Sequence, residues 1–195
     1  MIMPFKLADP KHWINILWLF WVVLWTAVAF TAKRTRAEEP AGARILYLIP
    51  IVLAAMLIFS PALRVGTLTH RFVPQSLALQ WVGVAMTALG IAITFWARVH
   101  IGRNWSGRVV IKEQHELIRT GPYASVRHPI YTGLLLALAG TALAIGELRA
   151  VIAFALAAVH FFQKAKREER FMSQEFGEEY ARYRSESGML LPCFR

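Results

Sequence analysis

Long stretches of this chain contain no charged residue, and that pattern limits what the chain can fold into. The first stretch, residues 13–32, has no Asp, Glu, Lys or Arg, and Lys33, Arg34 and Arg36 follow it. A helix needs about 20 apolar residues to cross a bilayer core of ~30 Å. The stretch is long for a signal-peptide core, and a basic cluster directly after it is typical of a retained membrane helix.

Further apolar stretches predict membrane helices at residues 45–63, 74–97, 130–146 and 150–164. Pro50 and Pro61 predict a kink in the first of these. The last is short for a span, but Lys164 and Lys166 can extend it by placing their amines among the lipid headgroups. The sequence therefore predicts an all-α polytopic membrane protein, a single integral membrane domain with about five transmembrane helices.

The distribution of basic residues predicts the orientation of these helices. With five spans, 17 Lys and Arg fall on one side of the membrane and 5 on the other. Cytoplasmic segments carry the excess, so we predict the N-terminus outside and the C-terminus in the cytoplasm. An arrangement with four spans would place the basic C-terminal tail on the other side of the membrane, and the excess of basic residues on one side would be lost. The cytoplasmic side then holds residues 98–128 and a tail, 165–192, in which Met172, Phe176, Tyr180 and Tyr183 predict an amphipathic helix.

Several chemistries have no support in the sequence. The net charge is +10, but the charges form clusters between apolar stretches, which is not the pattern of a nucleic-acid-binding protein. No glycine-rich dinucleotide motif, Walker loop or zincin motif is present. The six His never fall three or four residues apart, and Cys193 is the only cysteine, so we expect no metal site and no internal disulfide.

Two segments on the predicted cytoplasmic side contain the residues suited to chemistry. In Arg127-His128-Pro129-x-Tyr131, the proline suits the first turn of a helix, where its missing N–H costs nothing. Arg127 and His128 would then join a helix N-terminus in attracting an anion. The second segment is Glu168-Glu169, shortly after the last apolar stretch. Taken singly, each segment is also compatible with an ordinary interfacial arginine or a solvated acidic pair.

The combination is more specific. Together with Asn104-Trp105-Ser106, Leu117, Gly121-x-Tyr123 and Phe176-Gly177-x-x-Tyr180, these segments resemble the isoprenylcysteine carboxyl methyltransferase and phospholipid methyltransferase family of integral membrane proteins. The resemblance covers roughly residues 80–192. It implies S-adenosylmethionine as cofactor, with S-adenosylhomocysteine as product, bound in a pocket that faces the cytosol.

The resemblance also implies roles for individual residues. It gives Arg127 and Glu168 catalytic roles, and Asn104, Trp105 and Arg127 contact with the substrate. The cofactor-binding positions that it implies are His115, Leu117, Gly121, Tyr123, His128, Pro129, Tyr131, Glu168 and Glu169. Cations suit the cofactor carboxylate, an acid suits its ammonium or ribose hydroxyls, and an aromatic ring suits its sulfonium. The division of roles between the two glutamates stays open.

A membrane location predicts a lipidic or lipid-anchored methyl acceptor, with the bilayer as the surrounding partner and no nucleic acid. A carboxylate acceptor is already ionised and needs only a cation such as Arg127, whereas an amine must first lose a proton to a base such as Glu168 or His128. Arg127 favours the carboxylate. A phospholipid ethanolamine acceptor remains an alternative, as do, more remotely, a sterol-reductase-like oxidoreductase and a non-catalytic membrane protein.

Small residues leave the packing of the helices open. Gly133 and Gly140 suit the close approach of two membrane helices, within one chain or between two copies. The oligomeric state stays open for the same reason.

Overall fold

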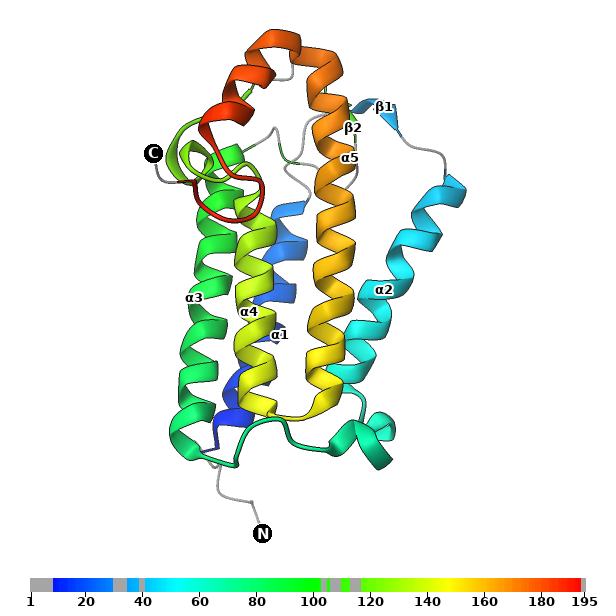
Figure 1. The fold of residues 1–195 in the computed structure, drawn as a ribbon, viewed down its shortest axis with the longest axis vertical. Coiled ribbons are helices and arrows are strands. Elements are labelled where there is room, and N and C mark those ends of the chain that lie inside the picture. Colours follow the sequence, from blue (N-terminus) through cyan, green and yellow to red (C-terminus); the bar gives the residue numbers. More distant parts are fainter. Residues whose placement is uncertain are drawn as a thin grey trace.

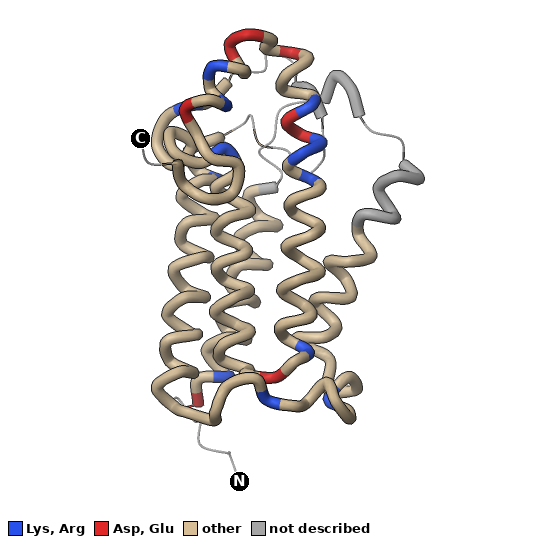
Figure 2. Tube along the Cα trace, in the orientation of Figure 1, with Lys and Arg blue, Asp and Glu red and all other residues tan. Residues whose placement is uncertain are grey.

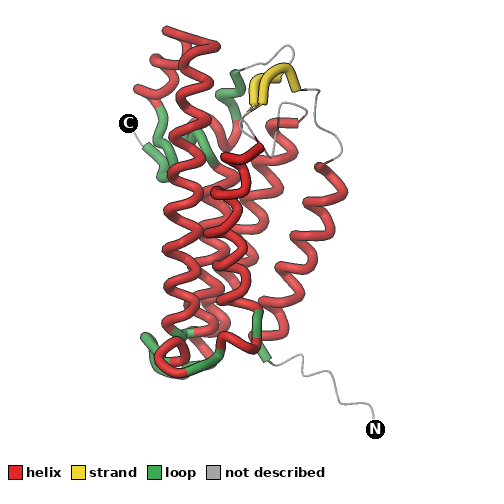
Figure 3. Tube along the Cα trace, turned by 90° about the vertical axis from the view of Figure 1, so that its right-hand side faces the viewer, coloured by secondary structure: helices red, strands yellow, loops and turns green. Residues whose placement is uncertain are grey.

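Five helices run alternately up and down a single bundle in the computed structural model, which describes residues 9–29, 35–38, 41–102, 105, 110–112 and 117–193 (Figure 1). The helices are α1 (Pro10–Ala29), α2 (Ala41–Phe59), α3 (Leu77–Ile101), α4 (Pro129–Ile145) and α5 (Leu148–Glu186). The predicted all-α class is confirmed. A short antiparallel pair of strands, β1 (Thr35–Glu38) and β2 (Val110–Lys112), is added at one end of the bundle (Figure 3).

The helices have the length and composition expected of a membrane protein. Within the described residues, α1, α3 and α5 are long and apolar enough to cross a bilayer, while α4 and the apolar part of α2, Leu48–Phe59, are shorter. Lys, Arg, Asp and Glu collect at the two ends of the bundle and are absent from its described middle (Figure 2). This division is what a bilayer core requires, because a charged side chain is costly there.

The ends of α3 differ slightly from the predicted 74–97. The helix begins after Ser76, whose side chain accepts a hydrogen bond from the Leu79 N–H at 3.5 Å. It continues to Ile101 and ends at Gly102, whose φ of 56° suits glycine. The last turn of α3 therefore contains a charged residue, Arg98. The predicted end was too early because it was placed at the end of the apolar stretch, and the helix continues beyond that point.

The largest difference from the predicted elements is in α5. A separate span and tail helix were expected, but one helix continues from Leu148 to Glu186, with a break at Gly177. No Gly or Pro lies between Leu148 and Gly177, so nothing stops the helix where its surroundings change from apolar to polar. Gly177 has φ 49° and ψ −123°, and the chain turns back there over the end of the bundle (Figure 1).

Glycines bring α3 and α4 into backbone contact. A Cβ added to Gly90 of α3 would lie 2.4 Å from the Gly133 carbonyl oxygen of α4. One added to Gly140 would lie 2.6 Å from the Gly83 carbonyl oxygen. From the sequence, Gly133 and Gly140 could pack either within one chain or between two copies. In the structure both pack against α3 of the same chain. The close packing of α3 against α4 fixes the position of the N-terminal end of α4.

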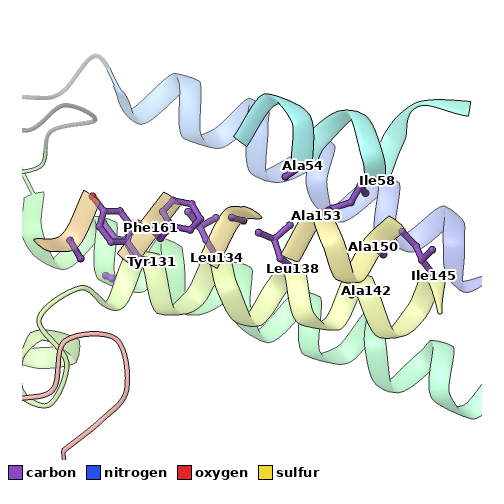
Figure 4. Packing of buried hydrophobic residues seen from close by; sticks show 14 of the residues in the cluster. Ala54, Ile58, Tyr131, Leu134, Leu138, Ala142, Ile145, Ala150, Ala153 and Phe161 are labelled. Carbon is purple, nitrogen blue, oxygen red and sulfur yellow. The ribbon is translucent and has the colours of Figure 1, made fainter. Parts of the chain in front are cut away.

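Small residues also let α5 approach its neighbours. Ala150 and Ala153 are fully buried, and α2 contributes Ala54 and Ile58 to the same cluster (Figure 4). At the end of the bundle where α5 begins, buried Arg149 donates hydrogen bonds to the carbonyls of Leu57 at 2.6 Å and Ile58 at 2.8 Å. These carbonyls belong to the last turn of α2, where a cation is favourable. The opposite end is where the predicted site residues lie.

Candidate active site

The N-terminal end of α4 meets the charged part of α5, and this is where the predicted site residues gather. Pro129 occupies the first helical position of α4, as expected. His128 and Arg127 therefore directly precede the N-terminal end of the helix. Glu168 and Glu169 lie on the part of α5 that runs past the same end. Asn104 and His115 lie outside the described residues.

His128 lies between the two glutamates. Its Nδ1 is 3.4 Å from Glu168 Oε2, and its Nε2 is 3.5 Å from Glu169 Oε1. Burial opposes protonation of this imidazole, but the two adjacent carboxylates outweigh it and raise the pKa of His128 above its ordinary value. The Nε2 atom is buried and faces Glu169, but the geometry of this contact does not make a hydrogen bond. A buried polar atom of this kind suits a polar ligand.

Arg127 is held by contacts on several sides. Its Nε lies 2.6 Å from Glu169 Oε1, and both side chains are under a tenth exposed. Its Nη1 donates to the backbone carbonyls of Ser187 and Arg184. The guanidinium therefore joins the start of α4 to the end of α5, and most of its described donors are used within the chain.

Tyr131, in the first turn of α4, completes the cluster. Its hydroxyl donates a 2.6 Å hydrogen bond to Glu168 Oε1. The ring stacks on that of Phe161 at a centroid distance of 5.1 Å (Figure 4). It also stacks on the ring of His128, at 5.4 Å. Glu168 is thus oriented from two sides, yet its side chain is 21% exposed against 6% for Glu169. Glu168 is the more accessible of the two acids.

Tyr123 and Gly121 belong to a short 3₁₀ turn, η4 (Gly121–Ala124), beside this cluster. The buried Tyr123 accepts a 2.6 Å hydrogen bond at its carbonyl from the Tyr183 hydroxyl. Burial raises the pKa of Tyr123 well above its ordinary value and that of Tyr183 to about 12, so both hydroxyls stay protonated at neutral pH. Gly121 has φ 59°, and a Cβ there would lie 2.6 Å from the ring of His100. His100 in turn stacks on Tyr123 at 6.3 Å.

Two of the predicted site residues, Leu117 and Trp105, lie apart from the cluster around His128. Leu117 is half-buried in the segment that leads to Gly121. Trp105 lies under the guanidinium of Arg98, which is 4.5 Å from its ring, and 5.2 Å from the ring of Trp25 in α1. The described contacts of Trp105 are thus with α1 and α3, and not with the cluster around His128.

The structure also adds a segment that sequence reasoning did not include. The chain after α5 runs beside the Arg127–His128 backbone, whose N–H groups donate to Gly188 at 2.8 Å and Met189 at 3.1 Å. Thr132 donates a 2.6 Å hydrogen bond to the Leu190 carbonyl. No motif indicates this pairing, since backbone groups make most of it and the two segments lie far apart in the chain. The segment from Ser187 to Cys193 thereby covers one side of the cluster.

Comparisons with known proteins agree with this description. Residues 82–174 match a family model described as the isoprenylcysteine carboxyl methyltransferase (ICMT) family. A probable protein-S-isoprenylcysteine O-methyltransferase from Oryza sativa subsp. indica is 36% identical over 108 residues, which are 54% of this chain and 56% of that protein. The human protein-S-isoprenylcysteine O-methyltransferase is 30% identical over 136 residues, 66% of this chain and 48% of that protein.

The fold is similar to that of a solved member of the family. The eukaryotic intramembrane Ras methyltransferase ICMT superposes with a TM-score of 0.65 at 20% identity, over 96% of this chain and 69% of that one. The resemblance inferred from the sequence is therefore confirmed, and with the apolar helices it identifies an integral membrane protein. The family named is one of methyltransferases, which implies a methyl donor. The chain spans about half the length of the curated relatives it matches.

Proposed function

We propose that this protein transfers a methyl group from S-adenosylmethionine to the carboxylate of a lipidic or lipid-anchored acceptor, at the end of the bundle where α4 begins. The observation that carries the proposal is the cluster of His128, Tyr131 and Glu168, held in one geometry at the membrane edge. It lies within the segment that matches the methyltransferase family. The names of the relatives support a prenylated cysteine as acceptor.

The residues of the cluster fit this cofactor. When bound, S-adenosylmethionine supplies a methyl group on a positively charged sulfur. The buried Nε2 of His128 makes no hydrogen bond to a described residue, although Glu169 Oε1 lies 3.5 Å away. The adjacent carboxylates raise the pKa of His128, which favours the protonated imidazole, a donor suited to a carboxylate. Glu168 suits an ammonium or ribose hydroxyls, and the ring of Tyr131 or Tyr123 suits a sulfonium.

The geometry supports different roles for the two glutamates. Glu168 is partly exposed and held by Tyr131 and His128, so we assign it contact with the cofactor. Glu169 is nearly buried and paired with Arg127, so we assign it a positioning role. Arg127, which the sequence suggested as a catalytic residue, would act mainly by holding Glu169 and the segment after α5. Alignment of acceptor and methyl group then provides most of the acceleration, up to roughly 7–11 kcal/mol in favourable systems.

Cofactor binding is the first test. We would titrate the detergent-purified full chain with S-adenosylhomocysteine in a calorimeter, beside His128→Ala, Glu168→Gln and, as a control, the exposed Glu178→Gln. We expect micromolar binding by the wild type and the control, and a loss of tenfold or more in the other two, about 1.4 kcal/mol or more. A folded wild type that does not bind would refute the proposal.

The acceptor is tested separately. Radiolabelled methyl groups from S-adenosylmethionine should appear as base-labile esters on a prenylated cysteine acid supplied in nanodiscs. Base-stable label on ethanolamine phospholipids would instead show N-methylation, with Glu168 or His128 as the general base. Cofactor binding without transfer to either acceptor class would favour a non-catalytic protein.

The charge distribution further supports an N-terminus outside the membrane and a C-terminus in the cytoplasm. The described part of the site lies at the same end of the bundle as the charged part of α5 (Figure 2). That end would then face the cytosol, where S-adenosylmethionine is made available to enzymes.

A further inference from the structure

Lys164 lies on the side of α5 that faces the site, although it belongs to no recognised motif. Its Nζ is 5.4 Å from the centroid of the Tyr131 ring. The hydroxyl of the same tyrosine donates to Glu168, one helical turn further along α5. Because residues four apart share a helix face, Lys164 and Glu168 flank one aromatic ring.

The position of Lys164 along α5 places it between the membrane and the site. From Ala150 to Gln163 the helix has no Asp, Glu, Lys or Arg. Ile152, Val159 and Phe162 leave large apolar surfaces exposed on this stretch, as suits contact with lipid chains. Lys164 is therefore the first charged residue that follows the apolar part of α5. An acceptor whose chain lies in the bilayer would bring its polar group in at this level.

The charges of the site make this position selective. Arg127 is paired with Glu169, and His128 lies between Glu168 and Glu169. Arg184 also lies 3.6 Å from Glu169 Oε2, so two guanidinium groups balance the two carboxylates whatever the protonation state of His128. S-adenosylmethionine carries a carboxylate, an ammonium and a sulfonium and therefore adds one positive charge. Lys164 adds another, and a group that enters beside it meets a net positive site.

We propose that Lys164 determines acceptor specificity: its ammonium binds the carboxylate of the lipid-anchored acceptor at the membrane edge of the site. The inference rests on the proposed methyltransferase function and deepens it. The flexible stem of a lysine allows the ammonium to leave the Tyr131 ring and pair with the acceptor. The same charge would disfavour an ammonium acceptor, since like charges repel.

Equilibrium binding tests this inference without requiring turnover. The full chain in nanodiscs of neutral lipid would be titrated with an S-prenylated N-acetylcysteine acid and, in parallel, with its methyl ester. We expect the wild type to bind the acid roughly tenfold or more tightly than the ester, as a charge-assisted contact implies. Lys164→Met should remove that preference, and Lys164→Arg should keep most of it. Lys166→Met is the matched control, because Lys166 is exposed and stacks on Phe162.

Two further measurements separate the outcomes. Titration with S-adenosylhomocysteine should give Lys164→Met a dissociation constant within about twofold of the wild type. An equal loss of cofactor and acid binding would overturn the assignment to the acceptor. Equal binding of acid and ester by the wild type would overturn it as well, as would a short-chain phosphodiester lipid that competes as strongly as the acid. A wild type that prefers the acid and yet transfers no methyl group would contradict the proposed function but not the role of Lys164 in binding.

Discussion

Arg127 and Glu169 form the most buried ion pair of the site. A pair of this kind is not stabilising by itself, because removing two charges from water costs several kcal/mol per ion. Here the cost is offset by a 2.6 Å contact and by the backbone carbonyls that accept hydrogen bonds from Nη1 of the arginine. Removing Arg127 leaves the buried Glu169 with only the longer contacts to His128 at 3.5 Å and Arg184 at 3.6 Å, and removing Glu169 leaves a buried guanidinium without its carboxylate. The pair is therefore expected to be intolerant of single substitutions.

We predict that Arg127→Gln destabilises the protein by about 3–5 kcal/mol, the usual effect of breaking a buried pair. The double variant Arg127→Gln/Glu169→Gln should lose less than the sum of the two single variants, because it leaves no unpaired charge. Thermal unfolding in detergent, followed by intrinsic tryptophan fluorescence, measures all four proteins. Additive losses would show that the two side chains do not interact.

His128 makes the stability of this end depend on pH. Its pKa is raised above the ordinary 6.5, so the folded state binds a proton more tightly than the unfolded state. The resulting stabilisation is complete below pH 6.5 and is lost as the pH rises through the raised pKa.

We therefore expect the unfolding temperature of the wild type to fall, relative to that of His128→Gln, as the pH is increased from 6.5 through the raised pKa. Paired melting curves at closely spaced pH values measure this difference. A constant offset between the two proteins across the series would contradict the proposed coupling between His128 and the glutamates.

At the scale of elements, the contact of α3 with α4 determines where His128 and Tyr131 lie. Thr87 is fully buried in this contact, and its hydroxyl lies 3.2 Å from the Ala137 carbonyl oxygen across the helices. Gly90 and Gly133 remove the side chains that would keep the two backbones apart. Close helix pairs of this type rely on shape complementarity, since lipid chains are as apolar as the helices.

We predict that Gly90→Ala costs roughly 1–3 kcal/mol, because its Cβ would lie 2.4 Å from backbone atoms that cannot move alone. Ala85→Val, which enlarges an exposed position of the same helix, is the control and should change stability by less than about 0.5 kcal/mol. Thermal unfolding in detergent measures both. Equal effects would show that the packing of α3 against α4 is not tight.

At the scale of the whole molecule, the two ends of the bundle carry different residues. The end with the site gathers the basic and acidic residues of α5, and the other end holds the turns that join α2 to α3 and α4 to α5 (Figure 2). The protein has a single cysteine, Cys193, at the site end. This cysteine provides a direct test of orientation.

We predict that a membrane-impermeant maleimide labels Cys193 in inverted membrane vesicles and not in right-side-out vesicles. Thr67→Cys in a Cys193→Ser background should show the opposite pattern, because Thr67 is exposed in the turn at the other end. Gel-shift counting of labelled protein measures both variants. Labelling of Cys193 from outside would reverse the proposed topology.

The sequence by itself determined the class of the fold and the composition of the site. Uncharged stretches of membrane-spanning length predict helices whatever their partners, because an unpaired backbone group is too costly in lipid. The resemblance carried by Arg127, His128 and Tyr131, together with the pair Glu168-Glu169, selected residues that the structure brings together. The apolar stretches are local patterns that composition alone reveals, whereas the site residues required the combination of two segments far apart in the chain.

Only the tertiary structure decided how those residues are used. The pairing of Arg127 with Glu169, the exposure of Glu168 and the approach of Lys164 to Tyr131 depend on how α4 and α5 are juxtaposed. The packing of Gly133 and Gly140 against α3, and the path of the chain beside Arg127 after α5, depend on long-range contacts in the same way. Such contacts join residues that are far apart in the chain, so no single stretch of sequence contains the information to predict them.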